Sequence, residues 1–199
     1  MIDKGFFFRK NREMDLFRKI AVVFYDGLQT ILLIAAVFLV LYIFVVEPHE
    51  VSGLSMYPTF NNHDFLLSNL LAVRFHELKH GDVVVFKSPV EVDKLYIKRI
   101  IGMPGDRVKV QDGKVYLNGT LLDESGYLKS DVVTYGGASL QDGIEYVVPA
   151  GDLVVMGDNR PNSSDSRAWG FLDEEKLIGR STIRMWPLNT FEFIHNPFK

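Results

Sequence analysis

The sequence predicts a mainly β domain that follows one N-terminal transmembrane helix. Residues 27–46 form an uncharged run of 20 residues, and a helix of that length, at ~1.5 Å per residue, crosses the ~30 Å hydrocarbon core of a membrane. After residue 47, short runs rich in β-branched and aromatic residues alternate with turn-forming residues, which is typical of antiparallel sheets. We therefore expect three parts, namely a basic segment at 1–19, an anchor at 20–46 and one domain at 47–199.

Composition and charge exclude several classes of protein. The chain has no cysteine, so disulfides, a thiolate nucleophile and a cysteine-ligated metal site are excluded. The net charge is −3, yet the first 19 residues carry six Lys or Arg against three Asp or Glu. Because the net positive charge is confined to this short segment, the chain is not expected to bind nucleic acid.

The charged residues around the apolar run predict its orientation. Six basic residues precede it: Lys4, Arg9, Lys10, Arg12, Arg18 and Lys19. By the positive-inside rule the N-terminus lies in the cytoplasm, and everything after Glu47 lies across the membrane. The run is longer than a signal-peptide core, and Val45-Val46-Glu47 lacks the small residues of a cleavage site, so the anchor should stay attached. A buried core helix is the alternative, but the run is apolar on all sides.

Pro48 should end the helix, and strand-like runs follow it along the chain. They cover residues 64–69, 83–86, 95–101, 108–110, 114–117, 146–148, 153–156 and 182–186. Asp112-Gly113 and Asn118-Gly119 predict tight turns, because type I′ turns require positive φ angles. Residues 123–143 are polar and without periodicity, so we expect a long loop, and residues 172–177 suggest one helical turn.

The first stretch that suggests chemistry is V-S-G-L-S-M-Y-P-T at residues 51–59. Gly53 permits unusual backbone angles and Pro58 fixes the exit of the turn, so Ser55 is presented on a bend. A serine becomes a nucleophile when a neighbouring base removes its proton and donors stabilise the oxyanion. Most strings of this kind are ordinary turns, so this stretch alone is weak support.

The second stretch is Y-I-K-R-I-I-G-M-P-G-D at residues 96–106. Alternation along a strand sends Lys98 and Arg99 to opposite faces, so one cation should point inward. An inward lysine loses hydration, which lowers its pKa from about 10.4 and makes it a possible general base. Arginine stays protonated and cannot take this role. The alternative is an edge strand whose outward lysine prevents aggregation.

The third stretch is G-D-N-R-P-N-S-S-D-S-R-A-W-G at residues 157–170. Its interleaved Arg, Asp and Ser side chains could form a hydrogen-bonded platform, in which a serine orients the lysine amine. Most clusters of Asn, Ser and Asp are solvated loops, which is the alternative interpretation.

In this order and spacing, the anchor and the three stretches, together with G-D-V-V-V-F at residues 81–86, resemble the type I signal peptidase family of membrane-bound Ser/Lys proteases. The resemblance implies that Ser55 is the nucleophile, Lys98 the general base and Ser163 the residue that orients Lys98, while Asp165 and Arg167 form a supporting salt bridge. It also implies a mainly β ectodomain with an apolar surface on a bacterial plasma membrane. The single span is similar to that of Gram-positive members.

One position departs from the family pattern. In some members a serine two positions before the nucleophile donates its hydroxyl to the oxyanion, and here that position is Gly53. The backbone N–H of Ser55 can supply one donor, and we expect Ser52 or another group to supply the second.

The implied reaction is attack by Ser55, formation of an acyl-enzyme, and hydrolysis by a water that Lys98 deprotonates. Expected partners are signal-peptide-bearing pre-proteins and the lipid bilayer, without metal or cofactor. The five histidines show no ligand spacing, so we interpret them as surface or packing residues. Three alternatives are a Ser-His-Asp hydrolase, a self-cleaving Ser/Lys repressor, and a catalytically silent membrane-tethered relative that assembles surface proteins.

We also expect a substrate groove and an apolar rim near Ser55. The strand ending at Ser52 and the strand carrying Lys98 should flank a groove for an extended peptide. Its pockets should accept only small side chains one and three residues before the cleaved bond. Four side chains are candidates for an apolar surface on the membrane: Leu54, Met56, Tyr57 and Phe60.

Overall fold

The computed structural model describes residues 4–75 and 77–198, apart from the side chains of residues 4–16, 41 and 43. The chain forms two compact units that divide between Phe44 and Val45, two residues before the predicted boundary. Four of the six predicted flanking cations, Lys4, Arg9, Lys10 and Arg12, lie outside the described side chains.

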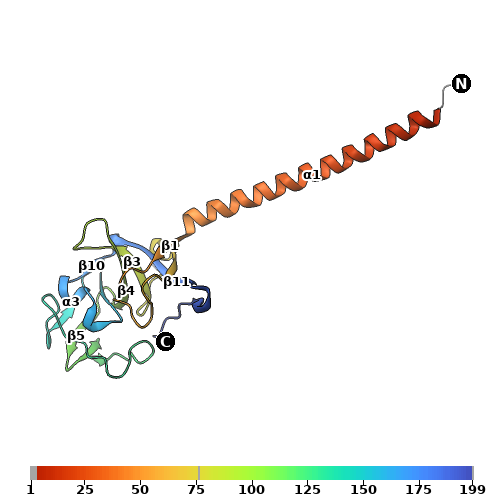
Figure 1. Ribbon diagram of the computed structural model, residues 1–199. Coiled ribbons are helices and arrows are strands. Elements are labelled where there is room, and N and C mark those ends of the chain that lie inside the picture. The colour runs from red at the N-terminus through yellow and green to blue at the C-terminus, as the bar shows by residue number, and fades with distance from the viewer. Residues whose placement is uncertain (1–3, 76, 199) are drawn as a thin grey trace. The chain divides into compact units, whose positions relative to one another are not determined.

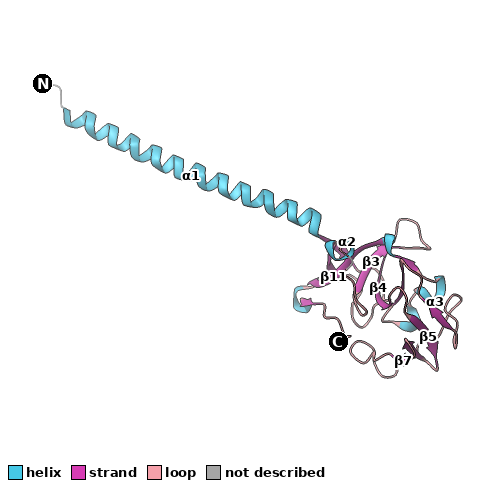
Figure 2. Cartoon of the chain, turned by 180° about the vertical axis from the view of Figure 1, so that it is seen from behind, coloured by secondary structure: helices cyan, strands magenta, loops and turns pink. Residues whose placement is uncertain are grey.

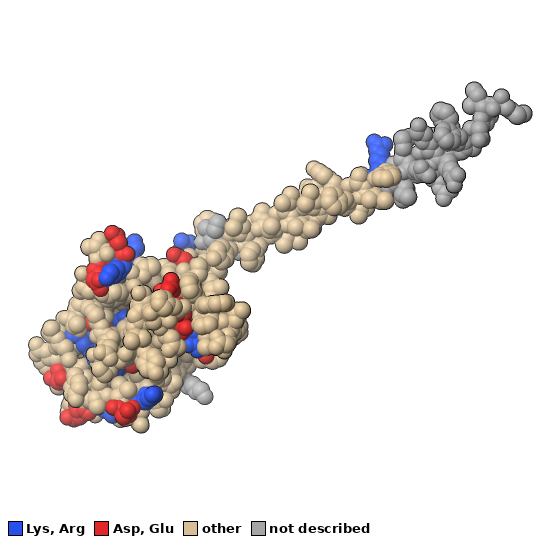
Figure 3. All heavy atoms as spheres, in the orientation of Figure 1, with Lys and Arg blue, Asp and Glu red and all other residues tan. Residues whose placement is uncertain are grey.

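The described part of the first unit is helical throughout and belongs to one continuous helix, α1 (Lys4–Val45), shown in Figure 1. Its segment Phe17–Val40 reaches a mean hydropathy of 2.0 and is long enough to cross a membrane. Its side chains are exposed, and the face in Figure 3 is uncharged along most of the described length. This is the surface expected of a helix surrounded by lipid.

The helix ends at Val45, three residues before the proline that the sequence suggested as its stop. Val46 already belongs to β1 (Val46–Glu50), which is the edge strand of a sheet. An edge strand tolerates Pro48 because a missing N–H costs nothing on the unpaired side.

The second unit contains two antiparallel sheets and a few short helices (Figure 2). The larger sheet has the order β1, β2, β11, β3, β4, β9, β10, and β12 pairs with β11. Its other strands are β2 (Phe65–Asn69), β3 (Val83–Lys87), β4 (Leu95–Gly102), β9 (Asp152–Met156), β10 (Leu172–Asp173), β11 (Leu177–Trp186) and β12 (Glu192–Phe193). The smaller sheet has the order β7 (Thr120–Leu121), β6 (Lys114–Leu117), β5 (Arg107–Gln111), β8 (Glu145–Val147). The helices are α2 (Leu71–Arg74) and α3 (Ser166–Trp169), with 3-10 turns at η1 (Arg160–Asn162), η2 (Glu174–Lys176) and η3 (Leu188–Thr190).

The two predicted tight turns are confirmed in the smaller sheet. Asp112 and Gly113, between β5 and β6, have φ angles of +53° and +76°. Asn118 and Gly119, between β6 and β7, have φ angles of +53° and +80°. These are the positive angles that a type I′ turn requires, and they explain why Asn or Asp followed by Gly occupies both turns.

The prediction of one helical turn over residues 172–177 is only partly right. Leu172 is fully buried and pairs with Leu153 in the ladder between β10 and β9, so a strand begins the segment. The helical part is the 3-10 turn η2, and β11 then starts five residues earlier than predicted. The buried positions at its start are Gly179 and Ser181, so the apolar alternation that would have revealed the strand is missing.

The strand β3 lies in the middle of the larger sheet and is buried on both faces. Val83 and Val85 belong to one hydrophobic cluster, whereas Val84 and Phe86 belong to another. Both faces of the neighbouring strand β4 are covered in the same way, which explains the burial of the charged side chains that it carries.

Candidate active site

Ser55 lies in a turn between β1 and β2 that is anchored by buried side chains. Met56 and Phe60 are buried in the core, and the N–H of Phe60 donates to the carbonyl of Met56 at 2.9 Å. Gly53 has a φ angle of +98°, a conformation that glycine adopts without strain. Ser55 itself is half-buried, so a well-anchored turn presents its hydroxyl at the surface of the domain.

Lys98 on β4 points at Ser55. Its Nζ donates hydrogen bonds to Ser55 Oγ at 2.8 Å and to the carbonyl of Ile97 at 2.9 Å. The side chain is 3% exposed. This burial lowers the pKa of Lys98 to about 8, against the opposing charges of Asp165 and Asp158. The structure therefore brings together the serine and the lysine that the sequence singles out.

The sequence predicted that only one of the two adjacent cations on β4 would point inward, and this was wrong. Arg99 is 2% exposed and donates to Asp158 through Nε at 2.9 Å and through Nη2 at 2.7 Å. Thr59, from the Ser55 turn, also donates to Asp158 at 2.5 Å. Arg99 thus has a carboxylate partner, whereas no described carboxylate lies within 4.0 Å of Lys98 Nζ. The lysine can lose its proton without breaking an ion pair.

Ser163 lies close to Ser55 but makes no hydrogen bond. Its Oγ is buried without a partner among the described residues. A Cβ atom added to Gly157 would lie 2.2 Å from Ser163 Oγ and 2.4 Å from the carbonyl oxygen of Ser55, so only glycine fits between the two serines. No described hydrogen bond joins Ser163 to Lys98, and its orienting role stays a prediction.

Asp165 and Arg167 form the ion pair that the resemblance implied. Arg167 donates to Asp165 through Nε at 2.8 Å and Nη2 at 2.7 Å, and both side chains are largely buried. Asp165 also accepts the N–H of Gly157 at 3.0 Å, and Arg167 donates to the carbonyl of Arg160 at 2.8 Å. Gly157 and Arg160 precede Ser163, and Asp165 and Arg167 follow it. The ion pair therefore fixes the backbone on both sides of Ser163.

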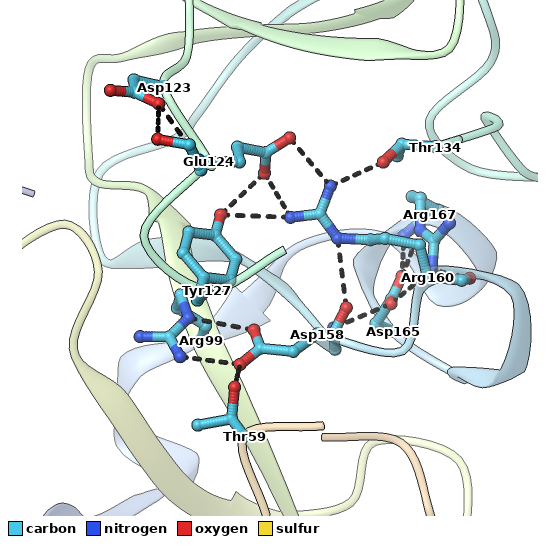
Figure 4. A network of polar contacts seen from close by, with 12 residues as sticks. Thr59, Arg99, Asp123, Glu124, Tyr127, Thr134, Asp158, Arg160, Asp165 and Arg167 are labelled. Carbon is cyan, nitrogen blue, oxygen red and sulfur yellow. Dashed lines mark hydrogen bonds and ion pairs between the residues drawn. The ribbon is translucent and has the colours of Figure 1, made fainter. Parts of the chain in front are cut away.

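A buried network around Arg160 extends this platform (Figure 4). Arg160 is an ion-pair partner of Glu124, and it donates to Thr134 at 2.7 Å and to Tyr127 at 3.2 Å. The ring of Tyr127 lies 4.3 Å from the guanidinium of Arg99. The sequence missed Glu124, Tyr127 and Thr134, because a polar loop without periodicity gives no local sign of such distant contacts.

A cavity of about 380 Å³ lies beside Ser55 and Lys98. Its lining residues are residues 48–56, residues 95–98, Val85, Asn162 and Ser164, and we call it the Ser55 groove. On one side β1 is an edge strand, and on the other β4 pairs with β9 only from Arg99 onward. Both strands thus have an unpaired edge here, and such edges accept an extended peptide by main-chain hydrogen bonds.

Two candidate oxyanion donors lie in this groove. The backbone N–H of Ser55 makes no hydrogen bond to any described residue, so it is free to donate. The exposed side chain of Ser52 lines the same groove. The N–H of Gly53, in contrast, already donates to Asn62 at 2.7 Å. The assignment of Ser52 or another group as the second oxyanion donor stays a prediction.

No described histidine makes a hydrogen bond to Ser55, as the base of a Ser-His-Asp site would. His63 and His80 lie 2.6 and 2.5 Å from the carboxylates of Glu50 and Asp106. Among the described residues no group of three His, Asp or Glu side chains could hold a metal ion. His49 is buried and lines the Ser55 groove.

The predicted apolar surface needs a correction. Leu54 and Tyr57 are exposed as expected, but Met56 and Phe60 are core residues, because they anchor the Ser55 turn. Other exposed apolar side chains of the second unit lie on or next to β2, β11 and β12: Phe65, Met185, Trp186, Leu188, Phe191 and Phe193. Phe65 and Trp186 are partners in the ladder between β2 and β11, so these residues are neighbours in space.

Comparison with known proteins gives consistent matches. The family described as signal peptidase, peptidase S26, matches residues 25–186. The chain is 34% identical over 184 residues to signal peptidase IB of Staphylococcus aureus (strain MRSA252), covering 85% of this chain and 95% of that one. It is 39% identical over 151 residues to probable signal peptidase I-2 of Synechocystis sp., and the match covers 73% of this chain and 65% of that one. A crystal structure of a signal peptidase I from Enterococcus faecalis V583 is similar with a TM-score of 0.44 and 30% identity, over 52% of this chain and 95% of that one.

Proposed function

Because the chain belongs to the signal peptidase family, peptidase S26, we propose that it removes signal peptides from secreted pre-proteins with Ser55 as nucleophile and Lys98 as general base. The observation that carries this proposal is the 2.8 Å contact between Lys98 Nζ and Ser55 Oγ. The pKa of Lys98, about 8, leaves a useful fraction of neutral amine near neutral pH.

In the proposed mechanism the neutral amine of Lys98 accepts the proton of Ser55 Oγ as that oxygen attacks the scissile carbonyl carbon. The tetrahedral oxyanion collapses, the C–N bond breaks, and the Lys98 ammonium returns the proton to the leaving amine. Lys98 then takes a proton from water as that water attacks the acyl-enzyme ester. The C–O bond to Ser55 breaks, the Lys98 ammonium returns the proton to Ser55 Oγ, and the signal peptide leaves as a carboxylic acid that ionises in solvent. The Ser55 N–H and Ser52 are the proposed oxyanion donors.

The platform behind these two residues would keep the lysine in position. We propose that Ser163 turns its unpartnered hydroxyl towards Lys98 in the substrate complex, where catalytic hydrogen bonds tighten. The ion pair of Asp165 and Arg167 fixes the segment that carries Ser163, so we assign it a positioning role.

We further propose that α1 anchors the enzyme in the plasma membrane. Residues 1–19 would be cytoplasmic, residues 20–46 would contain the span, and the domain that follows would lie outside the cytoplasm. The support is the apolar segment Phe17–Val40, preceded by basic residues. The exposed Leu54, Tyr57 and Trp186 are suited to contact with the lipid surface.

A catalytically silent relative is the second candidate, and the direct contact between Ser55 and Lys98 favours the enzyme instead. The test is cleavage of a pre-protein with Ala-x-Ala before the cleaved bond, using the full chain in detergent micelles. We expect the intact signal peptide and the mature protein as products, identified by mass spectrometry, and no cleavage by Ser55→Ala. An inactive wild type, or an equally active Ser55→Ala variant, would contradict the proposal.

A further inference from the structure

His49 occupies an unusual place for an ionisable side chain. It lies on β1, six residues before Ser55, is only 8% exposed, and lines the Ser55 groove. Val51, the first residue after β1, donates its N–H to the carbonyl of Asp64 at 2.8 Å and packs in a cluster with Val85 and Ile97. All three aliphatic side chains also line the groove, so the imidazole is a polar group next to aliphatic side chains.

The imidazole of His49 is also unsatisfied. Its Nε2 is enclosed without a hydrogen-bond partner, and its Nδ1, which is not enclosed in this way, makes no hydrogen bond to any described residue. His63 and His80, in contrast, each contact a carboxylate. Buried polar groups in proteins are normally paired. Of the two ring nitrogens only Nδ1 is not enclosed, so Nδ1 is the one that can pair with a group bound in the groove.

The protonation state limits what that ligand can be. Burial lowers the pKa of His49 below its ordinary value of 6.5, against the opposing charge of Glu47. The ring is therefore neutral at pH 7 and above, with one nitrogen as donor and the other as acceptor. A hydroxyl group both donates and accepts, so it can pair with the exposed Nδ1 in either tautomer.

Strand geometry assigns His49 to one substrate position. In an extended peptide, every second side chain points into the groove, at a spacing of ~6.6 Å. The residue before the cleaved bond must lie at Ser55, and the next inward residue is the third before that bond. Because His49 lies farther from Ser55 along the chain than Val51 does, and both line the groove, we assign its ring to the second of these positions.

We propose that His49 makes the Ser55 groove select a small hydroxyl-bearing side chain, serine or threonine, at the third position before the cleaved bond. The inference rests on the proposed peptidase function and adds a chemical preference to it. Threonine and valine have the same shape and differ only in the hydroxyl, so they isolate the hydrogen bond from the size of the side chain.

The test measures kcat/KM of the full chain in detergent micelles on a series of pre-proteins. Each has alanine before the cleaved bond, and alanine, serine, threonine or valine two residues earlier. We expect the wild type to favour threonine over valine by about two- to tenfold, which corresponds to one net hydrogen bond. The ratio should fall to one or below in His49→Phe and persist in His49→Gln, whose amide also donates and accepts.

Controls separate this inference from the proposed function. A wild-type ratio of threonine to valine near one overturns the inference without any variant, and so does a ratio that His49→Phe leaves unchanged. The preference for alanine over leucine directly before the cleaved bond should be the same in wild type and His49→Phe. If His49→Phe changes the selectivity equally at the first and the third position before the cleaved bond, His49 has a general packing role, and the inference is overturned. Failure of the wild type to cleave any member contradicts the peptidase function itself.

Discussion

Lys98 and Arg99 show how partners, rather than burial alone, decide the chemistry of a cation. Both side chains are nearly inaccessible to water. Arg99 has a bidentate carboxylate in Asp158, which compensates its charge. Lys98 donates to a hydroxyl and a carbonyl and lies over the ring of Tyr96, without a carboxylate partner among the described residues, so its charged form is poorly compensated and its pKa falls. The sequence predicted the low lysine pKa but not the burial of both cations.

Replacement of Lys98 tests its role as the base. Lys98→Arg and Lys98→Met should each lower kcat/KM by roughly 10²–10⁴-fold, because neither side chain can accept a proton at neutral pH. Ser163→Ala should lower it only about tenfold, since it removes one orienting hydrogen bond. Cleavage assays at saturating and limiting substrate provide the measurement. Near wild-type activity in Lys98→Arg would refute the assignment.

The pH profile gives a second test at the level of this residue. The pKa of Lys98 is lowered to about 8, so the amine is protonated and inactive below this value and neutral above it. The kcat/KM should rise with pH and level off above about 8, and at pH 6 it should be roughly a hundredfold lower than on the plateau. A rate that does not change between about pH 6 and 9 would exclude Lys98 as the base.

At the level of elements, strands and turns could be predicted where consecutive residues carry the pattern that defines them. Strands such as β3 and β4 and the two tight turns carry their signal in consecutive residues, and they were predicted well. The start of β11 was missed because its buried positions are Gly179 and Ser181. The loop at residues 123–143 was predicted as a loop, but its contacts with Arg160 span about 26 to 36 residues and leave no periodic pattern.

This loop should matter for stability. Glu124→Gln removes the carboxylate partner of Arg160, whose side chain is 0% exposed, and leaves a buried charge poorly compensated. We expect the free energy of unfolding to fall by about 3–5 kcal/mol. The matched control is Glu91→Gln, which breaks the exposed pair with Lys94 and should have no measurable effect. Urea unfolding of the two variants compares them, and equal stabilities would show that the network contributes little.

The groove between β1 and β4 predicts a size limit directly before the cleaved bond. Val51 and Ile97 line this groove near Ser55, and we expect these aliphatic side chains to leave room only for a small side chain there. Leucine or tryptophan in place of alanine should lower kcat/KM by about tenfold to a hundredfold, because overfilling a packed pocket costs about 1–3 kcal/mol. Cleavage across a series of residues at this position measures the effect. A flat profile would exclude the groove while leaving the Ser/Lys chemistry intact.

At the level of the whole molecule, two units have different surfaces. The helix α1 is apolar enough to cross a membrane, and the second unit has its own exposed aromatic residues, which include Trp186 and Phe193. The sequence predicted the helix from its length and composition. It predicted the apolar surface only in part. The sequence alone does not show which apolar residues of a turn are buried in the core and which are exposed.

A deletion separates the contributions of the two units to membrane binding. A chain without residues 1–44 keeps β1 intact, since Val46 pairs with Asn69. We expect it to sediment with liposomes, because exposed apolar side chains favour the lipid interface. A variant of the same fragment with Trp186→Ser and Phe193→Ser should bind about tenfold more weakly. If the unmodified fragment stays in the supernatant, the apolar surface does not serve the membrane.

The open edges of β1 and of the first half of β4 also limit the conformation in which a substrate can bind, and therefore the stage of its folding at which it can be cleaved. A peptide that fills the space between them must be extended, at ~3.3 Å per residue. In a helix the same residues rise only ~1.5 Å each, and their N–H groups are already bonded within the helix. We therefore expect a precursor to be cleaved only while the residues around its cleavage site are unwound. Cleavage and folding would then compete in time, and a precursor that folds across this site first would keep its signal peptide.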